Sequence, residues 1–248
     1  FPYTTLFRSY SYTRDKVVSI PYVDKDLNLF QGSVVVELAT TTQGAKIRYT
    51  LDGSEPTEES FLYKHPFSLN KTTQVKARGF KEGYHPSRVL SIIALKAELK
   101  DALSVHPVQN GVTYKYFEGN YQKVTDIEKT PLLRTGVLSK PSIQGASRTD
   151  HFGYIFSGLI KVPENGVYTF QTSSDDGSVL YIDNELVVNN DGSHAAIPAT
   201  GFIALEKGFH SYKLYYFEDY EGEHLSWAWK LPSAETLVPI PSSVLYVE

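Results

Sequence analysis

The chain has 248 residues, a formal net charge of −4 and no cysteine. This charge gives no basic footprint for nucleic acid or an anionic membrane, and without thiols there is no disulfide framework, thiolate nucleophile or zinc–cysteine site. Residues 1–110 carry 14 basic and 11 acidic side chains, whereas 111–248 carry 10 and 17. We therefore expect any cation to bind in the second half.

Residues 1–17 are expected to be an artefactual or lead-in segment. The stretch Phe1–Ser9, FPYTTLFRS, resembles a translated sequencing adapter, and such segments are set aside when a fold is predicted. On this interpretation, a signal peptide and a catalytic domain would lie upstream. Nowhere in the sequence does an apolar run approach the roughly 20 residues that a membrane span requires.

Residues 18–95 show the alternation of short strands separated by turn residues. The 18 Tyr and 13 Phe of the whole chain favour β-structure over helix. In KIRYTLDG, Ile47, Tyr49 and Leu51 fall on one face, and Asp52-Gly53 is suited to a turn that closes a hairpin. The pattern predicts an immunoglobulin-like β-sandwich.

Two stretches of this region, IRYTLDGSEPTEES and TTQVKARGFKEGYHPS, carry a family resemblance. They resemble the small fibronectin type III-like sandwich at the C-terminus of chitobiases and β-hexosaminidases. In that family the module is structural, so the resemblance implies no active-site residue. DGSEPT alone is compatible with a calcium cage or, as we expect, a plain turn.

Residues 96–110 are expected to be a linker or a single short helix, because Leu95–Gly111 contains the most helix-like stretch and is punctuated by Pro107 and Gly111. A second, longer β-rich region follows over 111–248. Within it Leu225, Trp227, Trp229 and Leu231 alternate onto one face. This spacing predicts that the tryptophans belong to the core and are not exposed for stacking on sugars.

Almost all of 111–248 resembles the protective-antigen lectin-like family, called the PA-fourteen family. The resemblance is carried by GVTYKYFEG, by FGYIFSGLIKVPENGVYTFQTSSDDGSVLYIDNELVV, by GFIALEKGFHSYKLYYFEDYEGEHLSWAWK and by LVPIPSSVLY, in that order. It implies an antiparallel β-sandwich of two sheets, often a glycan-binding unit. The whole chain is thus predicted to be all-β, with two sandwich domains.

Asp175 and Asp176 are the most conspicuous candidate site. On a regular strand, adjacent side chains point to opposite faces, so both carboxylates reach one target only if the chain bends there. A calcium site, a structural turn and catalysis remain open. Catalysis is disfavoured because paired glycosidase carboxylates flank the bond at about 5–5.5 or 6.5–9.5 Å.

The family resemblance implies a calcium site with a cis peptide between Asp175 and Asp176. Calcium takes six to eight oxygen ligands, so a second loop must contribute. The matching loop, FEDYEGEH at 217–224, contains no asparagine, whereas the family's calcium-dependent adhesins use one. The predicted metal ligands are Asp175, Asp176, Asp219 and Glu221.

Two loops supply the predicted ligand-binding residues. NNDGSH at 189–194 is a polar turn that follows a strand and is open to two interpretations, a ligand contact or a plain Asp-Gly turn. The loop 217–224 offers further acidic and aromatic side chains. The predicted glycan contacts are Asn190, Asp191, His194, Glu218, Tyr220 and His224.

The two family resemblances together imply a non-catalytic, carbohydrate-binding accessory region of a secreted bacterial glycoside hydrolase, an exo-β-N-acetylhexosaminidase. Its expected partners are a glycan or glycoconjugate and the missing N-terminal catalytic domain, with calcium as a candidate cofactor. The expected location is secreted, periplasmic or cell-surface. The alternatives are a structural spacer or docking module without sugar binding, a glycan-binding surface adhesin, and catalysis by this chain itself.

Overall fold

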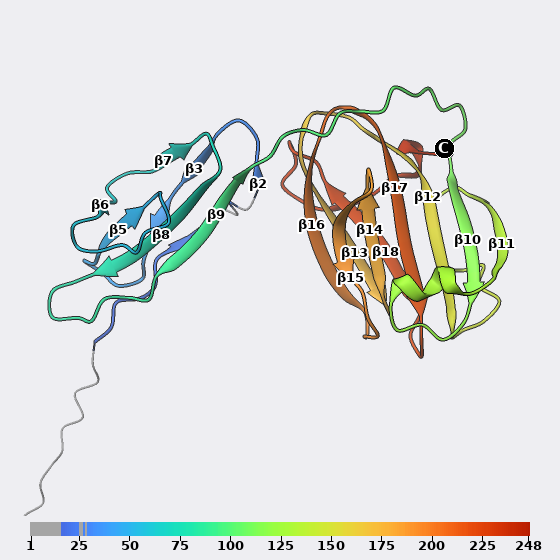
Figure 1. Ribbon diagram of the computed structural model, residues 1–248, viewed down its shortest axis with the longest axis horizontal. Coiled ribbons are helices and arrows are strands. Elements are labelled where there is room, and N and C mark those ends of the chain that lie inside the picture. Colours follow the sequence, from blue (N-terminus) through green and yellow to red (C-terminus); the bar gives the residue numbers. More distant parts are fainter. Residues whose placement is uncertain (1–15, 25–26, 28) are drawn as a thin grey trace, which may run out of the picture. The chain divides into compact units, whose positions relative to one another are not determined.

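A computed structural model describes residues 16–24, 27 and 29–248, and they form an all-β chain. The proposed adapter segment Phe1–Ser9 lies outside the described residues. The chain divides into two compact units between Lys96 and Ala97 (Figure 1). In the described part of the chain, no helix has the length and apolar character needed to cross a membrane.

The first unit is a small sandwich built around a five-stranded sheet of order β2-β9-β8-β5-β6. Strands β1 and β4 form one two-stranded sheet, and β3 and β7 form another. The strands are β1 Tyr22–Val23, β2 Leu29–Phe30, β3 Val34–Val36, β4 Leu38–Ala39, β5 Lys46–Thr50, β6 Phe61–Leu62, β7 Phe67–Leu69, β8 Thr73–Phe80 and β9 Leu90–Lys96. Its core includes the fully buried Val36, Val75, Ala77 and Ala94.

The turn expected after KIRYT is present but does not close a tight hairpin. Gly53 has a φ of +81°, and the Asp52 carboxylate accepts hydrogen bonds from Ser54 N at 3.0 Å and Ser54 Oγ at 2.6 Å. The next strand, however, begins only at Phe61. The chain therefore makes a longer loop before β6 pairs antiparallel with β5.

The second unit contains two packed sheets. The larger has the order β11-β10-β12-β17-β14-β15, with β20 also paired to β12, and the smaller has the order β16-β13-β18-β19. Its elements are β10 Val112–Glu118, η1 Val124–Lys129, β11 Leu132–Leu138, β12 Phe152–Val162, β13 Gly166–Asp175, β14 Ser178–Ile182, β15 Glu185–Asn190, β16 Ile197–Leu205, β17 Gly208–Glu218, β18 His224–Lys230, β19 Val238–Pro239, η2 Ser242–Val244 and β20 Leu245–Tyr246.

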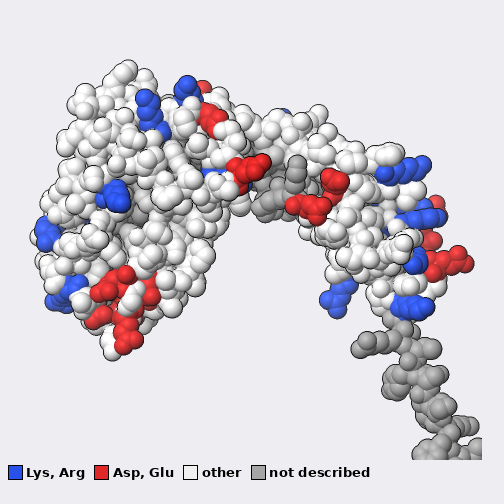
Figure 2. Space-filling model, turned by 180° about the vertical axis from the view of Figure 1, so that it is seen from behind, with Lys and Arg blue, Asp and Glu red and all other residues white. Residues whose placement is uncertain are grey.

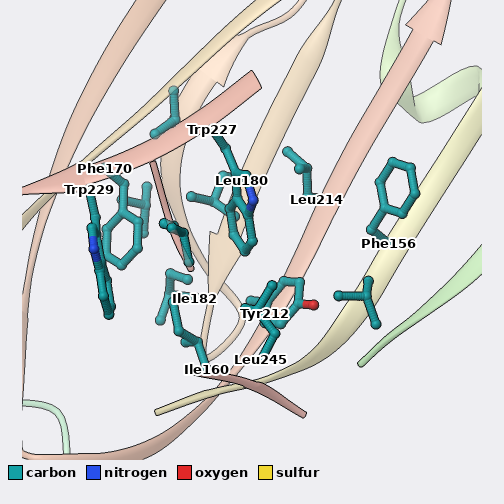
Figure 3. Packing of buried hydrophobic residues seen from close by; sticks show 14 of the residues in the cluster. Phe156, Ile160, Phe170, Leu180, Ile182, Tyr212, Leu214, Trp227, Trp229 and Leu245 are labelled. Atoms are coloured by element: carbon teal, nitrogen blue, oxygen red, sulfur yellow. The ribbon is translucent and has the colours of Figure 1, made fainter. Parts of the chain in front are cut away.

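The core of this unit lies between its two sheets, where Phe170, Leu180 and Trp229 come together (Figure 3). Trp227 and Trp229 are only 8% and 3% exposed, so the predicted core position of both tryptophans is confirmed. A second cluster, which includes Phe117, Ile127 and Phe217, lies with η1 against the larger sheet. This cluster helps to explain why β12 is buried along nearly its whole length.

Residues 97–110 form no helix and belong to the second unit. Lys100 N donates to Ala204 O at 2.9 Å, and Leu103 N donates to Phe209 O at 2.8 Å. The helix considered for this stretch is therefore wrong. Main-chain pairing with β16 and with the start of β17 holds the segment extended instead.

Candidate functional site

The two aspartates lie where β13 leaves the smaller sheet and the chain crosses to β14 in the larger one. Asp175 is the last residue of β13 and pairs with His224, and β14 begins at Ser178. The peptide bond between Asp175 and Asp176 is cis, as the family resemblance implied. Both carboxylates accept hydrogen bonds from the loop between β15 and β16.

The Asp176 carboxylate joins two loops through their main chains. It is only 4% exposed. His194 N donates to Oδ1 at 2.7 Å, Asp219 N donates to Oδ2 at 2.7 Å and Tyr220 N donates to Oδ2 at 3.3 Å. The β15–β16 and β17–β18 loops therefore meet on a single side chain.

Asp175 is half-buried beside them. Ala196 N donates to its Oδ2 at 3.1 Å, and the Tyr216 hydroxyl donates to its main-chain carbonyl at 2.6 Å. Gly222 closes the other side. Its φ is +91°, and a Cβ atom there would come within 2.7 Å of Asp175 Oδ2, so the β17–β18 loop needs glycine at this point.

Glu218, the last residue of β17, provides the third carboxyl next to those of Asp175 and Asp176. It is fully buried, and its Oε2 lies 2.8 Å from the Tyr216 hydroxyl. Burial raises the pKa of Glu218 to about 8, and the charges of Asp176 and Asp175 add to this effect. The carboxyl therefore holds its proton at neutral pH unless a cation replaces it.

A protonated Glu218 also resolves the hydrogen bonding of Tyr216. A tyrosine hydroxyl has one proton to donate, yet it contacts both the Asp175 carbonyl and Glu218 Oε2. When Glu218 carries a proton on Oε2, it donates to the tyrosine oxygen, which leaves the tyrosine proton for the carbonyl. Both contacts are then satisfied.

The three carboxyl groups fit the oxygen chemistry of a calcium ion. One oxygen from each of Asp175, Asp176 and Glu218 lies within 4.8 Å of the others, a spacing that ligands about 2.3–2.6 Å from one ion can span. The buried Oε1 of Glu218 has no hydrogen-bond partner among residues 16–24, 27 and 29–248, so an ion would satisfy an otherwise orphaned atom. Calcium binding stays a prediction.

Of the four predicted metal ligands, only the two adjacent aspartates belong to this group. Asp219 Oδ2 accepts from Ser193 Oγ at 2.8 Å, and its Oδ1 lies 3.7 Å from His151 Nδ1. Glu221 is exposed, with a φ of +61° and its N–H donating to Asp150 Oδ1 at 3.1 Å. Glu218, predicted as a glycan contact, provides the third clustered carboxyl instead.

Asn190 has an internal position in place of the predicted glycan contact. It is 6% exposed, and its amide nitrogen donates to Ser174 Oγ and to Ile197 O, each at 3.0 Å. Glu218 is likewise buried beneath the aspartates. Neither side chain is available to a ligand that approaches from solvent.

Asp191 is occupied by its own surroundings. Its Oδ1 accepts hydrogen bonds from Val124 N at 2.8 Å and from Gly192 N at 3.1 Å. The first bond caps the start of η1 and ties it to the β15–β16 loop. Asp191 therefore serves chiefly to fix the loop in the folded domain.

Three predicted contacts reach the surface of the loops. Tyr220 is 66% exposed and His224 is also exposed, while His194 is half-buried with its Nε2 3.2 Å from Asn190 O. Figure 2 shows Asp and Glu side chains clustered at the lower end of this unit, where the β17–β18 loop lies in Figure 1. In the chain, Tyr220 and His224 are neighboured by the acidic residues Asp219, Glu221 and Glu223.

Sequence reasoning missed the supporting roles of Tyr216, Asp150 and His151. Alternation along β17 was a usable signal, because Leu214, Tyr216 and Glu218 must share a face, and all three are buried. No comparable signal marks Asp150 or His151. Their roles arise only when the 150–151 turn meets the β17–β18 loop in the folded chain.

The second unit is thus an antiparallel two-sheet sandwich with adjacent aspartates at one end. Residues 108–242 match the family model described as the PA14 domain, the PA-fourteen family named above, and the chain belongs to this family. Residues 28–91 match the model described as the chitobiase/beta-hexosaminidase C-terminal domain. Both family resemblances noted in the sequence are confirmed.

One curated relative resembles most of the chain. It is a beta-hexosaminidase of Porphyromonas gingivalis (strain ATCC BAA-308 / W83), 26% identical over 222 residues. The match covers 84% of this chain and 28% of the relative. The chain thus spans little more than a quarter of that protein.

Two solved structures are similar to part of this chain. The PA14 domain of the MpAFP antifreeze protein has a TM-score of 0.49 at 14% identity, over 60% of this chain and 96% of that one. The Epithelial Adhesin 6 A domain from Candida glabrata, solved in complex with Galb1-3GlcNAc, has a TM-score of 0.47 at 15% identity, over 58% and 90%.

Proposed function

We propose that this chain is a non-catalytic, glycan-binding accessory region of a larger secreted glycoside hydrolase, an exo-β-N-acetylhexosaminidase. The observation that carries the proposal is the succession of a chitobiase/beta-hexosaminidase C-terminal domain and a PA14 domain on one chain. The resemblance of 84% of the chain to a beta-hexosaminidase supports the same parent. Secretion, to the periplasm, cell surface or medium, follows from a role on external glycans.

In this proposal the glycan binds at the loops above Asp175 and Asp176, and calcium is the cofactor. Asp175, Asp176 and Glu218 would hold the ion, which would neutralise their charge and fix the loops when bound. Tyr220 and His224 provide exposed side chains for the sugar. An aromatic ring presents an apolar face together with a polar group, which suits a sugar surface.

The test is thermal unfolding of the full chain with excess calcium and with EDTA. We expect calcium to raise the melting temperature by several degrees, because a ligand that binds only the folded state stabilises it by about 2.7 kcal/mol at 100 times its Kd. The Asp175→Asn/Asp176→Asn variant should lose this rise. A Glu58→Gln/Glu59→Gln variant, which neutralises two adjacent exposed acids in the first unit, should retain it.

Glycan-array binding of the same three proteins then tests the sugar. We expect the unsubstituted chain and the Glu58→Gln/Glu59→Gln control to bind glycan. We expect this binding to be lost in the aspartate variant or in EDTA. If the unsubstituted chain binds no glycan above background, glycan binding at this site is refuted. Equal melting curves in calcium and EDTA would refute the cofactor alone.

A second candidate, a spacer or docking module, rests on a different observation. The two aspartate carboxylates already accept four main-chain N–H bonds, from His194, Ala196, Asp219 and Tyr220. Those bonds alone give the aspartates a structural purpose. If the chain is a spacer or docking module, the aspartate variant should lose stability equally in calcium and in EDTA. The unsubstituted chain should then bind no sugar.

A further inference from the structure

Two hollows adjoin in the second unit at the turn between β14 and β15. One has a volume of about 390 Å³, with Leu99, Lys100 and Asp101 in its lining. The other has a volume of about 210 Å³. Asn184 and Ser211 line both, so the two hollows adjoin at these residues, and together they are called here the turn groove.

The turn groove is separate from the aspartate site. Ser211 lies near the start of β17 and Glu218 is its last residue, and the rise of about 3.4 Å per residue puts them roughly 24 Å apart along the strand. Asp175, Asp176 and Glu218 line neither hollow. A ligand in the groove would therefore bind independently of the proposed calcium.

A rigid turn forms the centre of the groove. Asp183 and Asn184 both have positive φ, 48° and 61°, as the two-residue turn of a tight β-hairpin requires. The Asp183 carboxylate accepts from Ser211 N at 2.8 Å and lies 2.6 Å from Nδ1 of the fully buried His210. Asn184 is exposed, and its side chain makes no hydrogen bond within the described chain.

Residues of the segment 99–103 form one wall of the larger hollow, and this wall is also held in place. Glu206 N donates to Lys100 O at 2.9 Å, in addition to the main-chain bonds of Lys100 and Leu103 described above. The Lys100 ammonium pairs with Glu185 Oε2 at 2.7 Å. Since Glu185 begins β15, this ion pair joins the wall to the hairpin that carries Asn184.

The chemistry of the lining combines donors, acceptors and an aromatic ring. Asn184 and Lys213 can donate, Asp101 and Glu248 can accept, and the half-buried Tyr181 adds a ring. The charged lining residues are the acids Asp101, Asp183 and Glu248 and the bases Lys100 and Lys213, which gives no preference for a polyanion. Closely spaced donors and acceptors with an aromatic surface instead match the hydroxyl groups and apolar ring faces of a sugar.

We propose that the turn groove is a second binding site in this domain, for a neutral oligosaccharide. The larger hollow, with a volume of about 390 Å³, falls within the range of about 300–1,000 Å³ typical of small-molecule sites. Asn184 and Ser211, which line both hollows, would contact adjoining sugar units. Lys213 and Tyr181 would contact the unit in the smaller hollow.

The experiment is a titration of the ¹⁵N-labelled full chain with N,N′,N″-triacetylchitotriose and, separately, with cellotriose, each to about 10 mM, in EDTA. We expect amide resonances of Tyr181, Asn184, Ser211 and Lys213 to shift with at least one probe. Asn184→Gly, which the positive φ accommodates, and Lys213→Ala should each weaken binding roughly fivefold, as the loss of one hydrogen bond predicts.

Two controls separate this proposal from the proposed function. Lys115→Ala removes another exposed lysine from the same sheet and should leave the affinity unchanged. The Asp175→Asn/Asp176→Asn variant should still bind in the turn groove even if it loses every calcium effect. Absence of shifts in the groove with both probes, or shifts unchanged in Asn184→Gly and Lys213→Ala, would overturn the proposal.

Discussion

The Tyr216 hydroxyl lies 2.8 Å from Oε2 of Glu218, on the buried face of β17. The same hydroxyl is 2.6 Å from the main-chain carbonyl of Asp175. Tyr216 therefore links the buried carboxyl to the backbone of the aspartate turn. Four residues earlier on the same face, Tyr212 is also buried, but its hydroxyl has no hydrogen-bond partner among the described residues.

This contrast predicts opposite results for the same substitution on one strand. Tyr216→Phe should destabilise the fold by about 2 kcal/mol, because it leaves a buried carbonyl and carboxyl without a partner. Tyr212→Phe should be neutral or stabilise by up to about 1 kcal/mol, because it removes an unsatisfied buried hydroxyl. Urea unfolding of both variants measures the difference, and equal losses would contradict it.

Glu218 predicts a pH dependence in the absence of calcium. Burial raises the pKa of Glu218 in the folded chain to about 8, whereas its ordinary pKa is 4.5. Between these values the folded state holds a proton that the unfolded state has released, so the contribution of Glu218 to stability falls as the pH rises. Glu218→Gln should remove that part of the decline, measured by urea midpoints in EDTA. An unchanged decline in the variant would refute the assignment.

The Asp183–His210 pair predicts a separate titration. Burial alone would lower the pKa of His210, but bonds to Asp183 and Glu206 O raise it above 6.5. Burial alone would raise the pKa of Asp183, but bonds from His210 and Ser211 hold it below 3.8. The contribution of His210 to the stability of the fold is complete below pH 6.5 and is lost as the pH rises through the folded pKa of His210. The contribution of Asp183 is complete above pH 3.8 and is lost as the pH falls through the folded pKa of Asp183.

Asp183→Asn tests the pair, because asparagine tolerates the positive φ of the turn. The substitution should cost about 3 kcal/mol near pH 6 by leaving His210 buried without its partner. It should also move the pKa of His210 below its wild-type value, as NMR titration of the ring would measure.

Gly201 predicts a steric limit where β16 passes β15. A Cβ atom at this glycine would lie 1.6 Å from the carbonyl oxygen of Val187, and a main-chain atom cannot give way as a flexible side chain can. Gly201→Ala should therefore cost more than about 3 kcal/mol. Gly145→Ala, whose Cβ would meet only the Tyr154 hydroxyl at 3.7 Å, should be nearly neutral. Similar melting temperatures for the two variants would contradict this packing.

The regular strands were predictable because burial follows a period of two. Alternation placed Trp227 and Trp229 in the core, where they lie 3–8% exposed. It could not predict residues 97–110, whose extended form depends on pairing with Ala204 and Phe209 more than a hundred residues away. Local helix preference gives way there to long-range hydrogen bonds.

The candidate site was predictable in its centre and not at its edges. Adjacent aspartates before a glycine stood out in the sequence, and the structure brings their carboxylates together with Glu218. The acidity of Asp219 and Glu221 within a loop predicts metal ligands, but neither belongs to this group. Where a loop side chain points depends on backbone conformation, such as the positive φ of Glu221, which the residue type alone does not specify.

The aspartates hold their loops by the main chain, and this has a consequence for loop variation. The donors to Asp175 and Asp176 are the amide N–H groups of His194, Ala196 and Asp219, together with that of Tyr220. Every amino acid except proline supplies that group. The side chains at these four positions can therefore be substituted, which changes the surface offered to a sugar, while the main-chain hydrogen bonds still hold the two loops.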